Sequence, residues 1–204
     1  MRKIFVTGIG TDIGKTVISS ILIEALHADY WKPIQAGNYF PTDSDKVKKW
    51  ISNSSTVVHP ERYILQQHMS PHAAAEHEGI TIDFDSITLP KTNNTLIIEG
   101  AGGVMVPLDD KSHFVIDLIQ KFDAETVVVI QNYLGSINHS ILTIDALKHR
   151  KNKILGGIFN GHPHPLSYKI ILDYTGVKLL GKVGKENVIS KDTILKYTEE
   201  FRSI

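Results

Sequence analysis

Short runs of apolar, mostly β-branched residues recur along the 204-residue chain, and segments with helical spacing separate them. The runs at 95–99, 126–131 and 154–160 do not alternate between apolar and polar positions, which is typical of strands covered by helices on both faces. Three further runs predict strands at 3–7, 29–32 and 177–180. Periodic segments predict helices at 15–27, 43–52, 70–78, 115–122, 138–150, 165–174 and 191–202.

The alternation of strands and helices predicts an α/β fold, a doubly wound and mostly parallel sheet with helices on both faces. No stretch resembles an interdomain linker, so we expect one domain over residues 1–204. Sheets of this kind bind ligands beyond the carboxyl ends of their strands. The residues that follow each predicted strand are therefore the first candidates for a functional site.

A glycine-rich segment, GIGTDIGKT at residues 8–16, joins the first predicted strand to the first predicted helix. Glycines allow backbone N–H groups to surround phosphate oxygens, and a helix N-terminus adds partial positive charge. We expect Lys15 to reach the terminal phosphates of a nucleotide and the Thr16 hydroxyl to hold Mg²⁺. The usual pattern has glycine where this chain has Ile9, with Gly8 and Gly10 on either side. The strand and the helix around the segment nevertheless indicate a phosphate-binding loop, as in P-loop NTPases.

Charged residues at the ends of two other strands extend this hypothesis. Lys32 ends the second strand before a turn, where a second ammonium group can stabilise charge during phosphoryl transfer. Glu99 ends a buried apolar strand and is a candidate Mg²⁺ ligand, because an unpaired buried carboxylate is costly. Mg²⁺ commonly takes a second carboxylate. If Asp43 or Ser44 caps the next helix, Asp45 is free to point at the metal.

The fourth and fifth strands also end in polar segments. Gly135 and Ser136 form a turn before the helix expected at Asn138, and N–H groups at that helix start can hold a carboxylate. Asn160 ends the fifth strand, and its amide offers one donor and one acceptor to a purine edge.

Composition excludes several functional classes. Lys plus Arg and Asp plus Glu each number 22, so the net charge is zero. The sequence also lacks the excess or stripe of basic residues that is typical of nucleic-acid-binding proteins. The absence of cysteine excludes disulfides and cysteine nucleophiles. No segment approaches the roughly 18 apolar residues of a membrane span, and the N-terminus does not resemble a targeting signal. We therefore expect a cytoplasmic protein.

Six motifs occur in an order that resembles the dethiobiotin synthetase family. They are the loop at residues 8–16, KPIQAG at 32–37, DSD at 43–45, SPH at 70–72, EGAGG at 99–103 and LGSINH at 134–139. The resemblance extends from residue 1 to about residue 160. It implies a homodimer that uses ATP to close a diaminononanoate and CO₂ into a cyclic urea, through a carbamate and its mixed anhydride with phosphate.

The resemblance also implies a role for individual residues. Thr11, Lys15 and Lys32 would be catalytic, and Thr16, Asp45 and Glu99 would hold Mg²⁺. ATP would bind Asp12, Ile13, Gly14, Lys15, Thr16, Val17 and Asn160. The substrate would bind Lys32, Ala36, Gly135, Ser136, Ile137 and Asn138, the last four across the dimer interface.

Two positions depart from the family pattern. Ala36 replaces a usual Ser or Thr and removes one hydroxyl contact to the substrate, and Ile9 replaces a usual Thr. The alternative interpretation is a partition- or septum-type ATPase that switches between partners. Those proteins carry a signature lysine five residues before the second lysine, where this chain has Gly10.

Overall fold

The structure is a computed structural model that describes residues 1–37 and 40–204. Its centre is a parallel sheet of seven strands, with β1 (Lys3–Gly8) in the middle. The sheet order is β4-β2-β6-β1-β7-β8-β9. The other strands of this sheet are β2 (Asp29–Trp31), β4 (Val58–His59), β6 (Leu96–Glu99), β7 (Glu125–Gln131), β8 (Ile154–Asn160) and β9 (Leu179–Val183). The predicted doubly wound fold is therefore confirmed.

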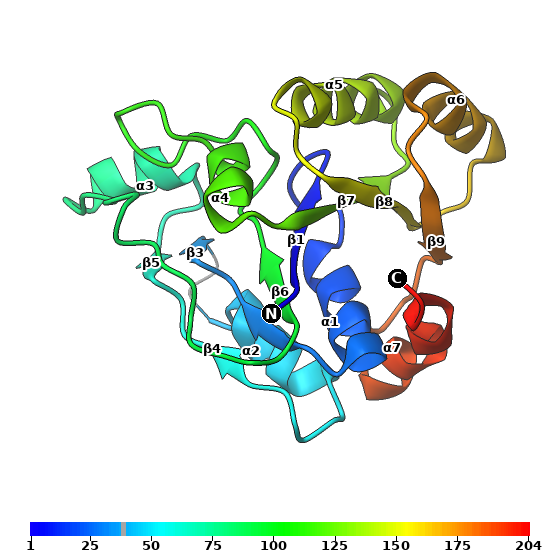
Figure 1. Cartoon of the computed structure of the whole chain (residues 1–204), viewed down its shortest axis with the longest axis horizontal. Helices are drawn as coiled ribbons and strands as arrows, with labels where there is room; N and C mark the ends of the chain where they lie inside the picture. The colour runs from blue at the N-terminus through cyan, green and yellow to red at the C-terminus, as the bar shows by residue number, and fades with distance from the viewer. Residues whose placement is uncertain (38–39) are drawn as a thin grey trace.

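Helices cover the sheet on both faces (Figure 1). On one side, α1 (Lys15–Leu26) packs against α2 (Asp43–Trp50) and α7 (Lys191–Thr198), which a 3₁₀ turn at Glu199–Phe201 extends. On the other side lie α4 (Val115–Phe122), α5 (Ser136–His149) and α6 (Pro165–Thr175), with α5 and α6 side by side (Figure 1). No helix among residues 1–37 and 40–204 is both long and apolar enough to cross a bilayer.

The apolar strands form the core. Most side chains of β1, β6 and β7 are completely buried, among them Phe5, Ile98 and Val128. This burial on both faces explains why their sequences show no alternation. The register pairs Val6 with Glu99 on one side of β1 and with Val127 on the other. The carboxyl ends of these strands consequently lie together at one edge of the sheet.

Most predicted elements are present, with small shifts at their ends. The last strand, expected at 177–180, is at Leu179–Val183, and α5 begins at Ser136, two residues before the predicted start. Sequence analysis missed β3 (Ile34–Ala36), β4 and β5 (Tyr63–Leu65), because each has only two or three residues. β3 and β5 form a separate parallel pair beside the main sheet, close to the short helix α3 (Pro71–His77).

Candidate active site

The glycine-rich loop leads from β1 into α1 at the carboxyl edge of the sheet. Gly14 caps the helix with a φ of 90°, a left-handed conformation that favours glycine. A Cβ atom at Gly14 would lie 2.1 Å from Nδ2 of Asn160, and that amide donates a 2.8 Å hydrogen bond to the Ile13 carbonyl. The close contact and the backbone conformation both require glycine here.

Lys15 begins α1 and bends back over the loop. Its ammonium group donates a 2.7 Å hydrogen bond to the Gly10 carbonyl, and the side chain is buried. Burial, together with the nearby charge of Lys32, lowers the pKa of Lys15 to about 8. A phosphate group placed in the loop would stabilise the charged form of this lysine.

Glu99 is the centre of a buried polar cluster beside the loop. Its Oε1 atom accepts hydrogen bonds from the Thr16 hydroxyl at 2.9 Å and from the Lys32 ammonium at 3.0 Å. Its Oε2 atom accepts one from the Tyr30 hydroxyl at 2.9 Å. Glu99 is 1% exposed and Lys32 is 4% exposed. The carboxylate is thus held in a buried place by donors from β2, from the residue that follows it and from α1.

The strand register explains this cluster. Tyr30 pairs with Ile97 and Trp31 with Ile98, so Lys32 follows β2 at the level of Glu99. Alternate residues of a strand share a face, which places Tyr30 and Lys32 on the same face as Glu99. Burial alone would lower the pKa of Lys32, but the Glu99 and Asp43 carboxylates outweigh it and raise that pKa above its usual value.

The start of α2 differs from the prediction. Thr42 is the N-cap, and a capping box joins it to Asp45: Asp45 N donates to Thr42 Oγ1 and Thr42 N donates to Asp45 Oδ2 at 3.0 Å. The expectation that Asp43 or Ser44 caps the helix was therefore wrong, and Asp45 is not left free. Asp43 instead accepts hydrogen bonds from Lys32 at 2.7 Å and from Lys46 at 2.8 Å.

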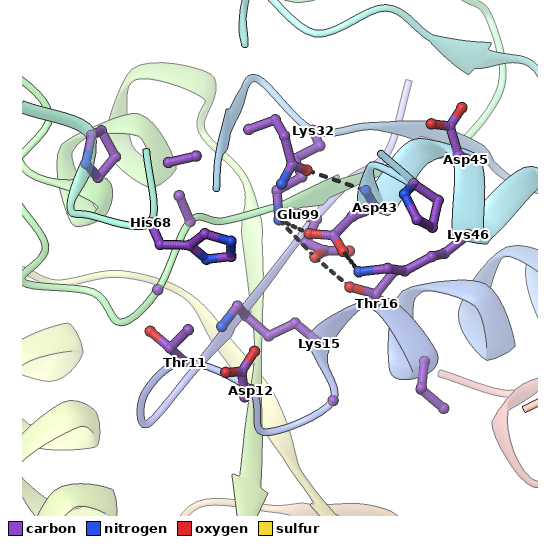
Figure 2. A pocket seen from close by; sticks show the side chains of 18 of the residues that line it. Thr11, Asp12, Lys15, Thr16, Lys32, Asp43, Asp45, Lys46, His68 and Glu99 are labelled. Carbon is purple, nitrogen blue, oxygen red and sulfur yellow. Dashed lines mark hydrogen bonds and ion pairs between the residues drawn. The ribbon is translucent and has the colours of Figure 1, made fainter. Parts of the chain in front are cut away.

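Most of these side chains, although not Tyr30 or Thr42, border one cavity of about 930 Å³ (Figure 2). Lys15, Lys32, Asp43 and Glu99 point toward its centre, whereas the Asp45 carboxylate is directed away from Glu99 (Figure 2). Of the residues expected at the site, the cavity is lined by Thr11, Asp12, Gly14, Lys15, Thr16, Val17, Lys32, Ala36, Asp45 and Glu99. One cavity therefore brings together most of the residues predicted to bind phosphate, to bind the metal ion or to act in catalysis.

Other predicted residues lie elsewhere. Gly135, Ser136 and Ile137 line a second cavity of about 350 Å³ at the start of α5, and Asn138 is exposed on the same turn. Gly135 caps α5 with a φ of 101°. The Ser136 N–H donates a 2.9 Å hydrogen bond to the Tyr133 carbonyl, whereas the next N–H groups of a helix start have no partner within the helix. The Ile13 side chain is buried in the core and does not line the cavity. Asn160 is within reach of the loop but already bonds Ile13.

The sequence did not assign Tyr30, Asp43 or Gln35 to the site. Tyr30 bonds Glu99 and Asp43 bonds Lys32, and Gln35 joins the Gly37 carbonyl at 2.9 Å to Asp43 N at 3.2 Å. The alternation of Tyr30 and Lys32 along one strand was the available signal for Tyr30. Nothing in the sequence separates the roles of the two aspartates.

The arrangement of Thr16 and Glu99 fits a magnesium ion. Their oxygen atoms lie 2.9 Å apart. Neighbouring ligands of octahedral Mg²⁺ are also about 3 Å apart, because each lies about 2.1 Å from the ion. Both oxygens are hard donors, as Mg²⁺ prefers, and phosphate oxygens and water can complete the shell.

Comparisons with known proteins decide the family. A family model described as an AAA domain matches residues 2–193. The ATP-dependent dethiobiotin synthetase BioD of Cytophaga hutchinsonii is 50% identical over 198 residues, 97% of this chain and 95% of that protein. The chain belongs to the dethiobiotin synthetase family. The Christiangramia forsetii member is 47% identical over 201 residues, 98% of this chain and 96% of that protein.

Solved structures show the same fold at greater distance from this dethiobiotin synthetase family member. A putative plasmid partition protein from Borrelia burgdorferi bound to AMPPNP has a TM-score of 0.59 at 12% identity, covering 99% of this chain and 96% of that one. The cell division ATPase MinD of Pyrococcus furiosus has a TM-score of 0.56 at 13% identity, covering 100% and 99%. At these identities the likeness shows the fold alone.

Proposed function

We propose that this chain converts a diaminononanoate, CO₂ and ATP into the cyclic urea dethiobiotin, ADP and phosphate. The observation that carries the proposal is the single cavity bordered by Lys15, Lys32, Thr16 and Glu99. It offers two ammonium groups and a carboxylate–hydroxyl pair beside a phosphate-binding loop. The family relationship supplies the identity of the substrates.

The proposed reaction has three bond-forming steps. One substrate amine attacks CO₂ and loses a proton, which gives a carbamate. A carbamate oxygen attacks the γ-phosphorus of ATP, ADP leaves, and a mixed anhydride forms. The second amine then attacks the carbonyl carbon, loses its proton and expels phosphate, which closes the ring. No step needs a protein nucleophile, because the substrate supplies both amines.

The protein's task is positioning and charge stabilisation. Lys15 and the loop from Thr11 to Thr16 would hold the phosphates of ATP. Lys32 is fixed at the end of β2 by Glu99 and Asp43, and it would neutralise the carbamate and the phosphoryl group passing between them. A carbamate and its anhydride hydrolyse readily, so a largely buried site protects them from water.

Thr16 and Glu99 would hold Mg²⁺. Asp45, whose carboxylate is directed away from Glu99 (Figure 2), would turn toward them to serve as the second carboxylate. Both Asp43 oxygens already accept hydrogen bonds from ammonium groups, Oδ2 from Lys32 and Oδ1 from Lys46, so Asp43 serves as their counter-ion. Asp45 borders the cavity and uses Oδ2 in its cap, which leaves Oδ1 for the ion or its water shell. When bound, Mg²⁺ would neutralise charge on the phosphate oxygens.

We place the remaining contacts to the nucleotide in the glycine-rich loop and at the end of β8. Asp12, Ile13, Gly14 and Val17 would contribute mainly backbone N–H groups to the phosphates. Asn160 would bind the adenine base, either through its Oδ1 atom as an acceptor or through its Nδ2 group after that group releases the Ile13 carbonyl.

The turn that we propose for the substrate carboxylate, 135–138, lines a different cavity from the phosphate loop. A second copy of the chain would bring this turn to the neighbouring active site. An apolar surface supports that arrangement: Leu134 is completely exposed, and large apolar side chains are exposed on both α5 and α6. These exposed side chains are Ile137, Leu142, Leu166, Ile170 and Tyr174.

The proposal is tested by measuring ADP release with each substrate omitted in turn. ADP should form only when the diamino acid and bicarbonate are both present. ATP hydrolysis that depends instead on DNA or on a protein partner would overturn the proposal and favour a partner-switching ATPase.

A further inference from the structure

We propose that Tyr30 is a positioning residue that fixes the Glu99 carboxylate for Mg²⁺. The inference rests on the proposed function of Glu99 as a metal ligand. Tyr30 does not border the cavity, and its role would be exerted entirely through Glu99.

The contact between the two residues is buried and direct. Tyr30 is 0% exposed, and its hydroxyl donates a 2.9 Å hydrogen bond to Glu99 Oε2. The opposite oxygen, Oε1, faces Thr16 and Lys32. The two carboxylate oxygens therefore have separate partners. Oε1 bonds Thr16 and Lys32, which line the cavity, and Oε2 bonds Tyr30, which lies in the core behind it.

This division fixes the plane of the carboxylate. The last torsion of a glutamate side chain is broad and weakly restricted on its own. With Oε2 bonded to a rigid strand residue, Oε1 stays 2.9 Å from the Thr16 hydroxyl. This is the spacing that adjacent ligands of Mg²⁺ require.

Tyr30 is suited to this role by its place in the sheet. It lies in the middle of β2 and pairs with Ile97 of β6, two residues before Glu99. Its ring is fully buried in the core, so the hydroxyl has little freedom to move. Residues that hold a metal ligand in this way commonly affect metal affinity about 10–100-fold.

The test is Tyr30→Phe, which removes only the hydroxyl and keeps the ring. Tyr168→Phe is the matched control, because that buried hydroxyl donates to the His162 carbonyl and does not contact Glu99. ADP affinity is measured by titration in EDTA and over a range of Mg²⁺ concentrations, so that the result does not depend on turnover. Melting temperatures show that each variant is folded.

In the wild type, Mg²⁺ should increase the affinity for ADP, and half of this increase defines a midpoint Mg²⁺ concentration. We expect Tyr30→Phe to raise that midpoint by about 10–100-fold. Its ADP affinity in EDTA should match that of the wild type, and Tyr168→Phe should behave as the wild type in both conditions. In a Glu99→Gln background, adding Tyr30→Phe should cause no further change. This last result separates action through Glu99 from a general loss of stability.

An unchanged Mg²⁺ dependence in folded Tyr30→Phe would overturn the inference, as would fully additive effects with Glu99→Gln. A wild-type protein whose ADP affinity and turnover both ignore Mg²⁺ would instead contradict the proposed metal site. The two failures are therefore distinguishable.

Discussion

The ammonium group of Lys32 lies 3.0 Å from Glu99 Oε1, and both side chains are buried. Asp43 contacts the same ammonium at 2.7 Å. A buried lysine between two carboxylates is fixed in position and fully charged, which suits a group that must meet a developing negative charge. The neighbouring Thr16 hydroxyl shares the same Glu99 oxygen, so the proposed catalytic ammonium and the proposed metal site are parts of one network.

We predict that Lys32→Ala lowers kcat by at least about 100-fold, because stabilisation of the transferring group is lost. Nucleotide affinity should change little, since the phosphate loop is intact. Titration with ADP and steady-state kinetics measure the two effects separately. Lys46→Ala is the control, because Lys46 contacts Asp43 but not Glu99.

The same variant leaves the buried Glu99 carboxylate and the half-buried Asp43 carboxylate without their shared cation. Breaking such a pair from one side commonly costs about 3–5 kcal/mol of stability. The melting temperature of Lys32→Ala must therefore be determined first. A loss of ADP affinity equal to the loss of rate, in folded protein, would assign Lys32 to nucleotide binding instead.

Asp43→Asn and Asp45→Asn distinguish the two aspartates of α2. We expect Asp45→Asn to raise the Mg²⁺ concentration needed for half-maximal turnover about tenfold, since Asp45 is the proposed ligand. Asp43→Asn should lower kcat at saturating Mg²⁺, because Lys32 loses a counter-ion. The reverse assignment of these two effects would make Asp43 the metal ligand.

Leu134→Asp tests the proposed contact between two copies of the chain. A charge on this completely exposed side chain should weaken an apolar interface and leave the fold intact. Light scattering should show a shift from dimer to monomer, with a higher KM for the diamino acid. Val188→Asp is the control, because Val188 is 71% exposed and lies outside α5 and α6. A wild-type monomer at full activity would refute the proposed dimer.

Asp29 provides a stability prediction outside the active site. Burial would raise its pKa, but hydrogen bonds from Thr92 and Val57 N outweigh this and lower it. A lowered folded-state pKa contributes stability above the unfolded pKa, about 3.9 for Asp, that is lost as pH falls through the folded pKa. Asp29→Asn should therefore cost about 1–3 kcal/mol at neutral pH.

The difference between wild type and Asp29→Asn should shrink below about pH 4. Urea unfolding at several pH values measures it. Asp173→Asn serves as the control, because Asp173 forms an exposed pair with Lys169, and such pairs contribute little. A stability gap for Asp29→Asn that stays constant down to pH 2 would contradict the prediction.

The sequence was sufficient to predict the long elements and the phosphate loop. Buried strands such as β7 and β8 are mostly apolar along their whole length. The loop at 8–16 is recognisable because its glycines allow the backbone N–H groups to surround a phosphate. Residues at strand ends, Lys32 and Glu99, were correctly placed together because parallel strands end at one edge of the sheet.

The sequence was less informative where pairing depends on distant residues. Strands of two or three residues, such as β4, are too short to show a periodic pattern. β4 forms because it pairs with the neighbouring strand β2. The roles of Asp43 and Asp45 depend on which residue caps α2, and three residues in a row can do so. Tyr30 resembles any other core aromatic until its hydroxyl is seen against Glu99.

The most direct test of the central claim is mass spectrometry of the reaction with ATP, Mg²⁺, the diamino acid and ¹³C-bicarbonate. The account predicts a cyclic urea that carries one labelled carbon, formed in equal amount to ADP and phosphate. ATP turnover without the labelled urea, or without need for the diamino acid, would contradict it.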